Sequence, residues 1–160
     1  MVPHQRFGPE LSVQELYDIL QLRVAVFVVE QACPYPELDG RDLEPTTQHR
    51  WLSDDQGIAC YLRTLPESHG AVRIGRVVTR SDRRGEQLSS RLLEAVLADV
   101  AGTVTVLDAQ SHLRTFYERF GYRVVGPAFS EDGIPHVPMQ RPADDGAIDD
   151  GSTSTWREVN

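Results

Sequence analysis

The sequence contains no lysine, because all sixteen of its Lys and Arg residues are arginine. Cysteine is almost as scarce: Cys33 and Cys60 are the only two, and their separation does not suggest a metal cluster. Nothing in the sequence points to secretion, the setting that favours disulfides. We therefore expect two free, buried thiols rather than a disulfide or a redox pair, and no metal site.

Long hydrophobic runs are also missing. No stretch approaches the ~20 apolar residues that a membrane span needs, and Pro3, Gly8 and Pro9 stand where a signal peptide has its basic and apolar regions. We expect no membrane association and a cytoplasmic location. A length of 160 residues suits one domain with a buried core.

Excess positive charge is absent as well, since the formal net charge is −8. Binding of nucleic acid over a broad surface needs a basic face, so the charge argues against that class. Half of the excess lies in residues 142–160, where one arginine stands against five acidic residues, a balance of 1 − 5 = −4. We predict a single domain over residues 1–141 and an acidic, disordered tail over residues 142–160.

The first half of the chain reads as one helix followed by a hairpin. Ser12 and Glu15 have the spacing of a capping box, and apolar residues then recur at helical intervals, which predicts a helix from about Val13. Its end is ambiguous, because the valines between residues 24 and 29 favour β structure. Helix breakers make residues 31–47 a loop, and residues 49–54 and 57–65 read as paired strands.

A strand, a polar loop and an amphipathic helix follow one another from residue 72 onward. The β-rich run 72–79 ends at a turn-like cluster, and leucines and valines then share one helical face, so we expect a helix starting near Gly85. The free N–H groups of a helix start, together with Arg80, Arg83 and Arg84, predict an anion site that suits a pyrophosphate.

The remaining segments complete an α/β pattern. Residues 103–107 read as a strand buried on both faces, and residues 111–120 as a short helix that Gly121 caps. Two further β runs, at residues 122–125 and 137–140, are separated by a turn at residues 131–133. The order of elements implies an α/β domain with a mixed sheet.

Three of these stretches resemble a known family, the GNAT-superfamily N-acetyltransferases, and within it the ElaA-like branch. They resemble the family's acetyl-CoA strand with its pyrophosphate loop, its late helix, and the N-terminal signature of the branch. The residues are Arg76-Val77-Val78-Thr79 with Arg84-Gly85-Glu86-Gln87-Leu88-Ser89, then Phe116-Tyr117-Glu118-Arg119-Phe120-Gly121-Tyr122, and lastly Leu22-Arg23, residues 26–31, Cys33-Pro34-Tyr35, Glu37, Asp39-Gly40 and Asp42. The resemblance implies a mixed, mostly antiparallel central sheet flanked by helices.

The resemblance also implies acetyl-CoA as co-substrate. Its binding residues would be Val77, Val78, Thr79, Arg84, Gly85, Glu86, Gln87, Leu88, Ser89 and His112. The loop departs from the family pattern at two small positions, which Gln87 and Ser89 occupy here. Glycine lets a backbone approach a pyrophosphate closely, whereas a helical conformation at either position would not require it.

Direct attack of an amine on a thioester needs a base, an oxyanion donor and an acid for the thiolate. The resemblance makes Tyr117 the general acid and the backbone N–H of Val78 an oxyanion donor. Glu30, Glu37 and Asp39 are expected near the substrate, where a carboxylate attracts a cationic amine. The base stays open among these three and Asp42, Glu44 and His49, each of which also suits a solvated loop or an arginine partner.

The leading hypothesis is therefore an enzyme that moves an acetyl group from acetyl-CoA to a primary amine. The acceptor is open among polyamines, aminoglycosides, a peptide N-terminus and a protein lysine. A second hypothesis, prompted by Gln87 and Ser89, is a non-catalytic CoA-binding or regulatory module. A third is an interaction domain without a nucleotide site. The oligomeric state is open, and it includes a homodimer.

Overall fold

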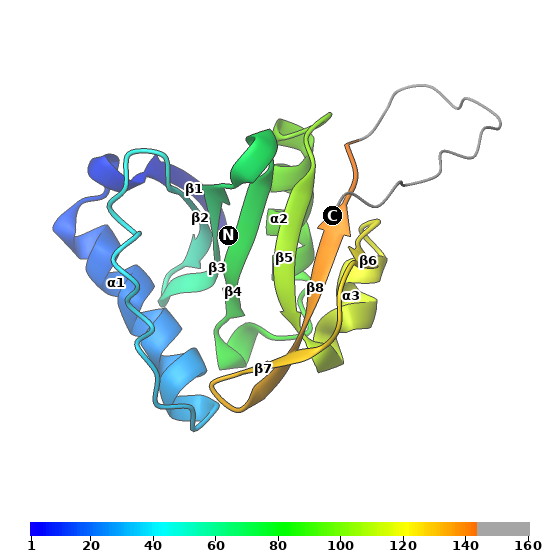
Figure 1. Cartoon of the computed structure of the whole chain (residues 1–160). Coiled ribbons are helices and arrows are strands. Elements are labelled where there is room, and N and C mark those ends of the chain that lie inside the picture. Colours follow the sequence, from blue (N-terminus) through cyan, green and yellow to red (C-terminus); the bar gives the residue numbers. More distant parts are fainter. Residues whose placement is uncertain (144–160) are drawn as a thin grey trace, which may run out of the picture.

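A mixed, mostly antiparallel sheet with helices on both faces forms the molecule, as predicted (Figure 1). The computed structural model describes residues 1–143. The sheet path is β1-β2-β3-β4-β5-β8-β6, with β7 paired to β8, and every neighbouring pair is antiparallel except β4 with β5. The strands are β1 (Val2–Phe7), β2 (Gln48–Asp54), β3 (Gly57–Pro66), β4 (Val72–Thr79), β5 (Thr105–Gln110), β6 (Arg123–Val124), β7 (Phe129–Glu131) and β8 (Ile134–Arg141).

The helices divide the core between the two faces of the sheet. Helices α2 (Leu88–Asp99) and α3 (Arg114–Glu118) cover one face, where Ile74, Leu93 and Leu107 belong to the larger buried cluster. Helix α1 (Val13–Arg23) covers β2, β3 and the end of β4 on the other face, through a smaller cluster that includes Ile19 and Val78. Its predicted capping box is present, since the Glu15 amide donates to Ser12 Oγ over 3.1 Å.

The helix that begins at Val13 does not give way to a strand at the valine run. It continues through Val24–Glu30 with a wider turn, in which the amides of Gln31 and Cys33 each donate five residues back, to Val26 O and Val28 O, over 3.1 Å. Such π segments are uncommon and gather at functional sites. The segment directs Glu30 and Gln31 toward the open half of the sheet.

Strand β1 was missed by the sequence analysis, which placed no element before residue 13. It is an edge strand, and its residues are exposed or half-buried. It therefore lacks the apolar alternation that marks a strand in a sequence. Its partner β2 supplies the pairing, and Pro3 is tolerated because edge strands need fewer donors.

Strands β4 and β5 separate soon after they meet. Only Val72 with Thr105 and Arg73 with Val106 are paired, and the two strands then diverge (Figure 1). Strand β5 extends to Gln110, beyond the predicted end at residue 107, and Asp108 is exposed. Within the predicted range, Thr105 and Leu107 are buried but Val106 is only half-buried, so burial on both faces is incomplete. On the side of Val106, α1 packs against β2, β3 and the end of β4 and does not reach β5.

The start of α2 also differs from the prediction. Gly85 and Gln87 have left-handed backbones, with φ of 84° and 58°, so the helix begins at Leu88 and not near Gly85. The conformation of Gln87 is therefore one that favours glycine, and not the helical one considered from the sequence.

Other predictions are confirmed. The hairpin is β2 with β3, and Gly121, with φ of 84°, donates its amide to Glu118 O at the end of α3. Both cysteines are free and buried. Within residues 1–143, no helix is long and apolar enough to cross a membrane. The predicted tail lies, from residue 144 on, outside the described residues.

Candidate functional site

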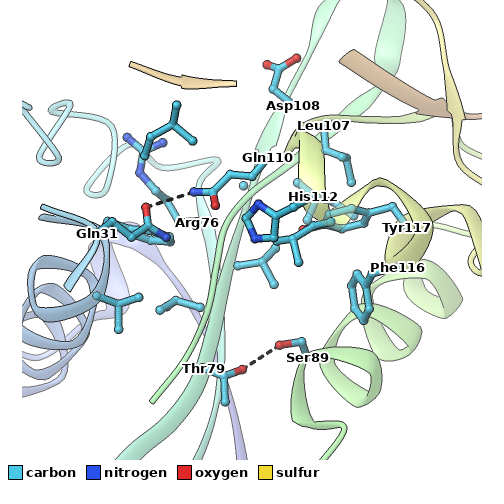
Figure 2. A pocket seen from close by; sticks show the side chains of 18 of the residues that line it. Gln31, Arg76, Thr79, Ser89, Leu107, Asp108, Gln110, His112, Phe116 and Tyr117 are labelled. Atoms are coloured by element: carbon cyan, nitrogen blue, oxygen red, sulfur yellow. Dashed lines mark hydrogen bonds between the residues drawn. The ribbon is translucent and has the colours of Figure 1, made fainter. Parts of the chain in front are cut away.

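The separation of β4 and β5 opens a cavity of about 900 Å³. Its walls come from the π segment and the loop after it, from β4, from the start of α2, from β5 with the turn before α3, and from the β7–β8 hairpin. Figure 2 shows how side chains from β4, β5 and the segment around His112 converge on this space. All the predicted cofactor-binding residues except Glu86 line it.

Strand β4 carries a bulge at the point where it passes the cavity. Tyr61 of β3 pairs with Val78 and Arg63 pairs with Gly75, so Arg76 and Val77 both stand opposite Leu62. Arg76 has a left-handed backbone with φ of 55°. A bulge leaves backbone groups without strand partners and redirects side chains. Val77 turns toward the α2 side, whereas Val78 turns toward α1.

The arginines of the loop are already paired. Arg80 and Arg83 both bind Asp54, with N–O distances of 2.9 and 2.8 Å, and the hydrogen bond from Arg80 lowers the pKa of Asp54 to about 2. Arg84 binds Glu30 of the π segment at 2.7 Å, at a pair about half exposed. The predicted phosphate ligand Arg84 and the predicted substrate residue Glu30 are thus each other's partner.

Ser89 faces the sheet and not the loop. Its hydroxyl lies 2.7 Å from Thr79 Oγ1 and 3.6 Å from Cys60 Sγ (Figure 2 shows the first contact). Cys60 is fully buried, and this burial raises the pKa of its thiol. The three groups tie the first turn of α2 to β4 and β3, so Ser89 fixes the helix start.

Tyr117 projects from α3 into the cavity, next to His112 (Figure 2). It packs edge-on against Phe116 and Tyr122, with ring centroids 5.0 and 6.0 Å away. Burial, and then the neighbouring Tyr122 and Cys60, raise its pKa, so the phenol stays protonated at neutral pH. Among residues 1–143 its hydroxyl has no hydrogen-bond partner, which leaves it able to donate to a ligand.

Glu37 and Asp39 lie beside the cavity and not on its wall. Glu37 is 2% exposed and binds Arg23 at 2.5 Å and Arg76 at 2.8 Å, and it also accepts the Tyr35 hydroxyl. Asp39 binds Arg63 at 2.5 Å. Both carboxylates are occupied by guanidinium groups, which does not favour direct contact with an acceptor. They hold Arg76, whose side chain reaches the cavity.

The other three residues considered as a base lie in the same region as Glu37 and Asp39. Asp42 binds Arg23 and Arg63, at 2.6 and 2.8 Å. The His49 ring is fully buried between the Tyr61 hydroxyl and Asp42 O, at 2.7 and 2.8 Å. Glu44 pairs with Arg41 at 3.1 Å. All three have protein partners and none lines the cavity.

Residues to which the sequence analysis gave no role at the site close the α1 side of the cavity. The Gln110 amide donates to Gln31 Oε1 over 3.1 Å, across the gap between β5 and the π segment (Figure 2). The Cys33 thiol donates to Asp132 O over 3.3 Å, which joins the loop after the π segment to the turn of the β7–β8 hairpin. His136 of β8 also lines this side. These partners are far apart in sequence, so no local pattern could have paired them.

The sheet, its separated parallel strands and the cavity between them define the fold of the acyl-CoA N-acyltransferases. The crystal structure of an acyl-CoA N-acyltransferase from Pseudomonas aeruginosa has a TM-score of 0.80 and 42% identity to this chain, and covers 88% of this chain and 99% of its own. For Escherichia coli ElaA the TM-score is 0.79 and the identity 41%, with the same coverage of 88% and 99%.

The sequence comparison places the chain within this class. The model of the acetyltransferase (GNAT) domain matches residues 14–142. A UPF0039 protein of Mycobacterium tuberculosis is 50% identical over 140 residues, which cover 85% of this chain and 90% of the relative. The chain therefore belongs to the GNAT acetyltransferases, and the resemblance to their ElaA-like branch is confirmed.

Proposed function

We propose that this protein transfers an acetyl group from acetyl-CoA to a primary amine, by direct attack of the amine on the thioester. The observation that carries the proposal is the cavity between β4 and β5, which joins the loop before α2 to the open face of β5 and has the Tyr117 hydroxyl in its wall. The similarity to an acyl-CoA N-acyltransferase supports the choice of a CoA thioester.

The cofactor's phosphates would lie at the loop before α2. Residues Arg84, Gly85, Gln87 and Leu88 line the cavity there, and the amides at the start of α2 carry the positive end of the helix dipole. A phosphate would replace Glu30 as the partner of Arg84, since that ion pair is half exposed and charge-assisted bonds to phosphate are strong. The pantetheine arm would follow the edge of β4 at Val77, Val78 and Thr79.

The acyl group would then lie at the bulge, where a backbone N–H of Arg76 or Val77 would serve as the oxyanion donor, because these two residues share one partner on β3. Val78, the donor expected from the sequence, suits this role less well because it is paired with Tyr61. Collapse of the tetrahedral intermediate breaks the C–S bond, and Tyr117 gives its phenolic proton to the departing thiolate. A phenol with a raised pKa is a weak acid in solution, but the thiolate forms beside it and accepts the proton. His112 lies near Tyr117 and would contact the pantetheine (Figure 2).

The test is release of CoA thiol from acetyl-CoA with a panel of primary amines: spermidine, kanamycin, an unblocked peptide and an Nα-blocked lysine peptide. The variant Tyr117→Phe should lose ~100-fold or more in kcat while it binds acetyl-CoA like the wild type. Tyr17→Phe, at a tyrosine 65% exposed on α1, is the matched control and should keep full activity.

The alternative is a non-catalytic CoA-binding or regulatory module, prompted by the left-handed Gln87 in the loop. It predicts a thermal shift with acetyl-CoA but no thiol release with any amine of the panel. Equal activity of Tyr117→Phe and the wild type would leave the enzyme standing and remove Tyr117 as its acid.

A further inference from the structure

We propose that His136 is the general base that takes the proton from the acceptor amine. The inference rests on the proposed acetyl transfer and names a residue for the step that the sequence left open. Three observations support it. They are the position of the His136 ring in the cavity wall, the free lone pair on one of its ring nitrogens, and the arginine partners of the carboxylates that could otherwise serve as the base.

His136 lies in the cavity wall, on the face of the sheet opposite α2. It stands directly opposite Gln110 in the β5–β8 ladder, and cross-strand partners point to the same face of a sheet. Their neighbours Ala109 and Val137 pack in the core on the α2 side, so Gln110 and His136 face the other way. The Gln110 side chain extends into the cavity on this face (Figure 2), and His136 lines it too.

The imidazole is held in the tautomer that a base needs. Nδ1 lies 2.8 Å from the carbonyl oxygen of Ile134, and a carbonyl can only accept, so Nδ1 carries the proton. The lone pair of the neutral ring is then on Nε2. The ring is stacked on Phe129, with centroids 5.8 Å apart, and only 12% of the side chain is exposed, so its orientation is fixed.

Carboxylates of β7, of the following turn and of β5 lie around the ring. From β7, Glu131 Oε2 lies 3.9 Å from Nε2, a separation that one water or a small movement can bridge. Asp132 follows in the turn and lines the cavity, and Asp108 of β5 is paired with Arg73 of β4 at 2.7 Å. Glu131 and Asp132 thus place negative charge beside the ring, which attracts a cationic amine.

Competing bases are less well placed. Glu30 is bound to Arg84. Glu37 and Asp39 are bound to Arg76 and Arg63, and neither carboxylate lines the cavity. His112 lines the cavity as well, but on the side of Tyr117, where the proposed thiolate leaves (Figure 2). The amine attacks one face of the planar thioester carbonyl, and His136 reaches the cavity from β8, whereas Tyr117 reaches it from α3.

The proton balance is simple. Nε2 takes one proton from the ammonium form of the acceptor, through one water, and leaves the neutral amine and an imidazolium. The nitrogen lone pair forms the C–N bond, and the C–S bond breaks with its electron pair on sulfur. Tyr117 protonates that sulfur and regains a proton from the nascent amide nitrogen. The imidazolium then releases its proton to solvent, so the reaction yields amide, free thiol and one proton.

The decisive experiment is the pH profile of kcat/KM for the best amine of the panel. With a base of imidazole type, the wild-type profile rises to a plateau below the pKa of the amine, near ~10 for an alkylamine. The variant His136→Gln should lose ~100-fold or more at neutral pH, keep the KM for acetyl-CoA, and show no plateau below the amine's own pKa. His69→Gln, in an exposed turn away from the cavity, should match the wild type.

A second variant does not depend on how His136→Gln folds. Glu131 is 62% exposed in its side chain, so Glu131→Gln should fold normally and raise the KM for the amine ~3-fold or more, because a negative charge that attracts the ammonium group is gone. A wild-type pH profile for His136→Gln, together with an unchanged amine KM for Glu131→Gln, would overturn the inference alone. Absence of thiol release by the wild type with every amine would overturn the proposed function, and this inference with it.

Discussion

At the scale of single residues, the loop before α2 contains the clearest local conflict. Gln87 holds φ at 58° and ψ at 24°, a left-handed backbone that costs a non-glycine residue roughly 1–2 kcal/mol. The sequence showed that a small residue was replaced here, but only the structure shows which property of glycine is missing. That property is backbone freedom at the residue before the first turn of α2.

The variant Gln87→Gly should therefore raise the free energy of unfolding by about 1 kcal/mol, because relief of the left-handed strain exceeds the added entropy of the unfolded chain. Urea unfolding at neutral pH measures it. Glu86→Gly is the matched control, since the neighbouring Glu86 has no positive φ, and it should lower the stability. Equal losses in both variants would contradict the strain at Gln87.

At the scale of elements, the residue that follows β1 is fixed against the loop before β2. The Gly8 amide donates to Thr47 O over 2.9 Å. A Cβ atom at Gly8 would meet the backbone oxygens of Asp42 and Glu44 at 2.6 and 2.7 Å, so the chain passes too closely there for any side chain. This contact fixes the loop that carries Asp42, and through Asp42 it supports the buried arginines.

Replacement of this glycine tests the attachment. Gly8→Ala should lower the free energy of unfolding by roughly 1–3 kcal/mol, because backbone must move to admit the methyl group. Gly75→Ala is the control, since a Cβ at Gly75 meets no atom within 4 Å and its backbone is not left-handed. Thermal or urea unfolding compares the two, and an unchanged midpoint for Gly8→Ala would show that the loop gives way freely.

At the scale of the whole molecule, a buried network of charges joins α1, the loop after it and the sheet. Arg23 is fully buried between Glu37 and Asp42, and Arg63 of β3 shares Asp42 and binds Asp39. Removal of one partner from such a pair leaves an uncompensated buried charge and typically costs ~3–5 kcal/mol. Glu37 and Asp39, two of the three acidic residues expected near the substrate, thus belong to the network that holds the fold, whereas Glu30 does not.

This network sets an expected pH dependence of stability. Burial lowers the pKa of His49 below 6.5, so the stability that its neutral form contributes is complete above about pH 6.5 and falls below it. Burial alone would raise the pKa of Asp39 and Asp42, but hydrogen bonds from Arg63 and Arg23 hold both pKa values low. Their contribution is complete above about pH 4 and is lost in stronger acid.

The unfolding free energy, measured with urea between about pH 8 and pH 3, should therefore decline in two stages. The first should vanish in His49→Gln, which has no titrating ring, while the second should persist. A stability that does not change between about pH 7 and pH 5 would contradict the depressed pKa of His49.

How much the sequence could predict depended on the distance along the chain between the interacting groups. The Ser12 cap, the β2–β3 hairpin and the Gly121 cap are local, and all were predicted. The pairing of Arg84 with Glu30 and of Cys33 with Asp132 joins residues 54 and 99 positions apart, and only the fold brings them together. A role for His136 could not be predicted for the same reason, since its position in the cavity wall follows from its pairing with Gln110 on the neighbouring strand.

The short ladder between β4 and β5 has a mechanical consequence. Two residue pairs, Val72 with Thr105 and Arg73 with Val106, are the direct pairing between the two halves of the sheet. Beyond these two pairs, the facing edges of β4 and β5 have no strand neighbour. Hydrogen bonds from a ligand in the gap would take the place of the missing strand pairs. A cofactor bound there would therefore complete the sheet and limit the movement of its two halves relative to each other.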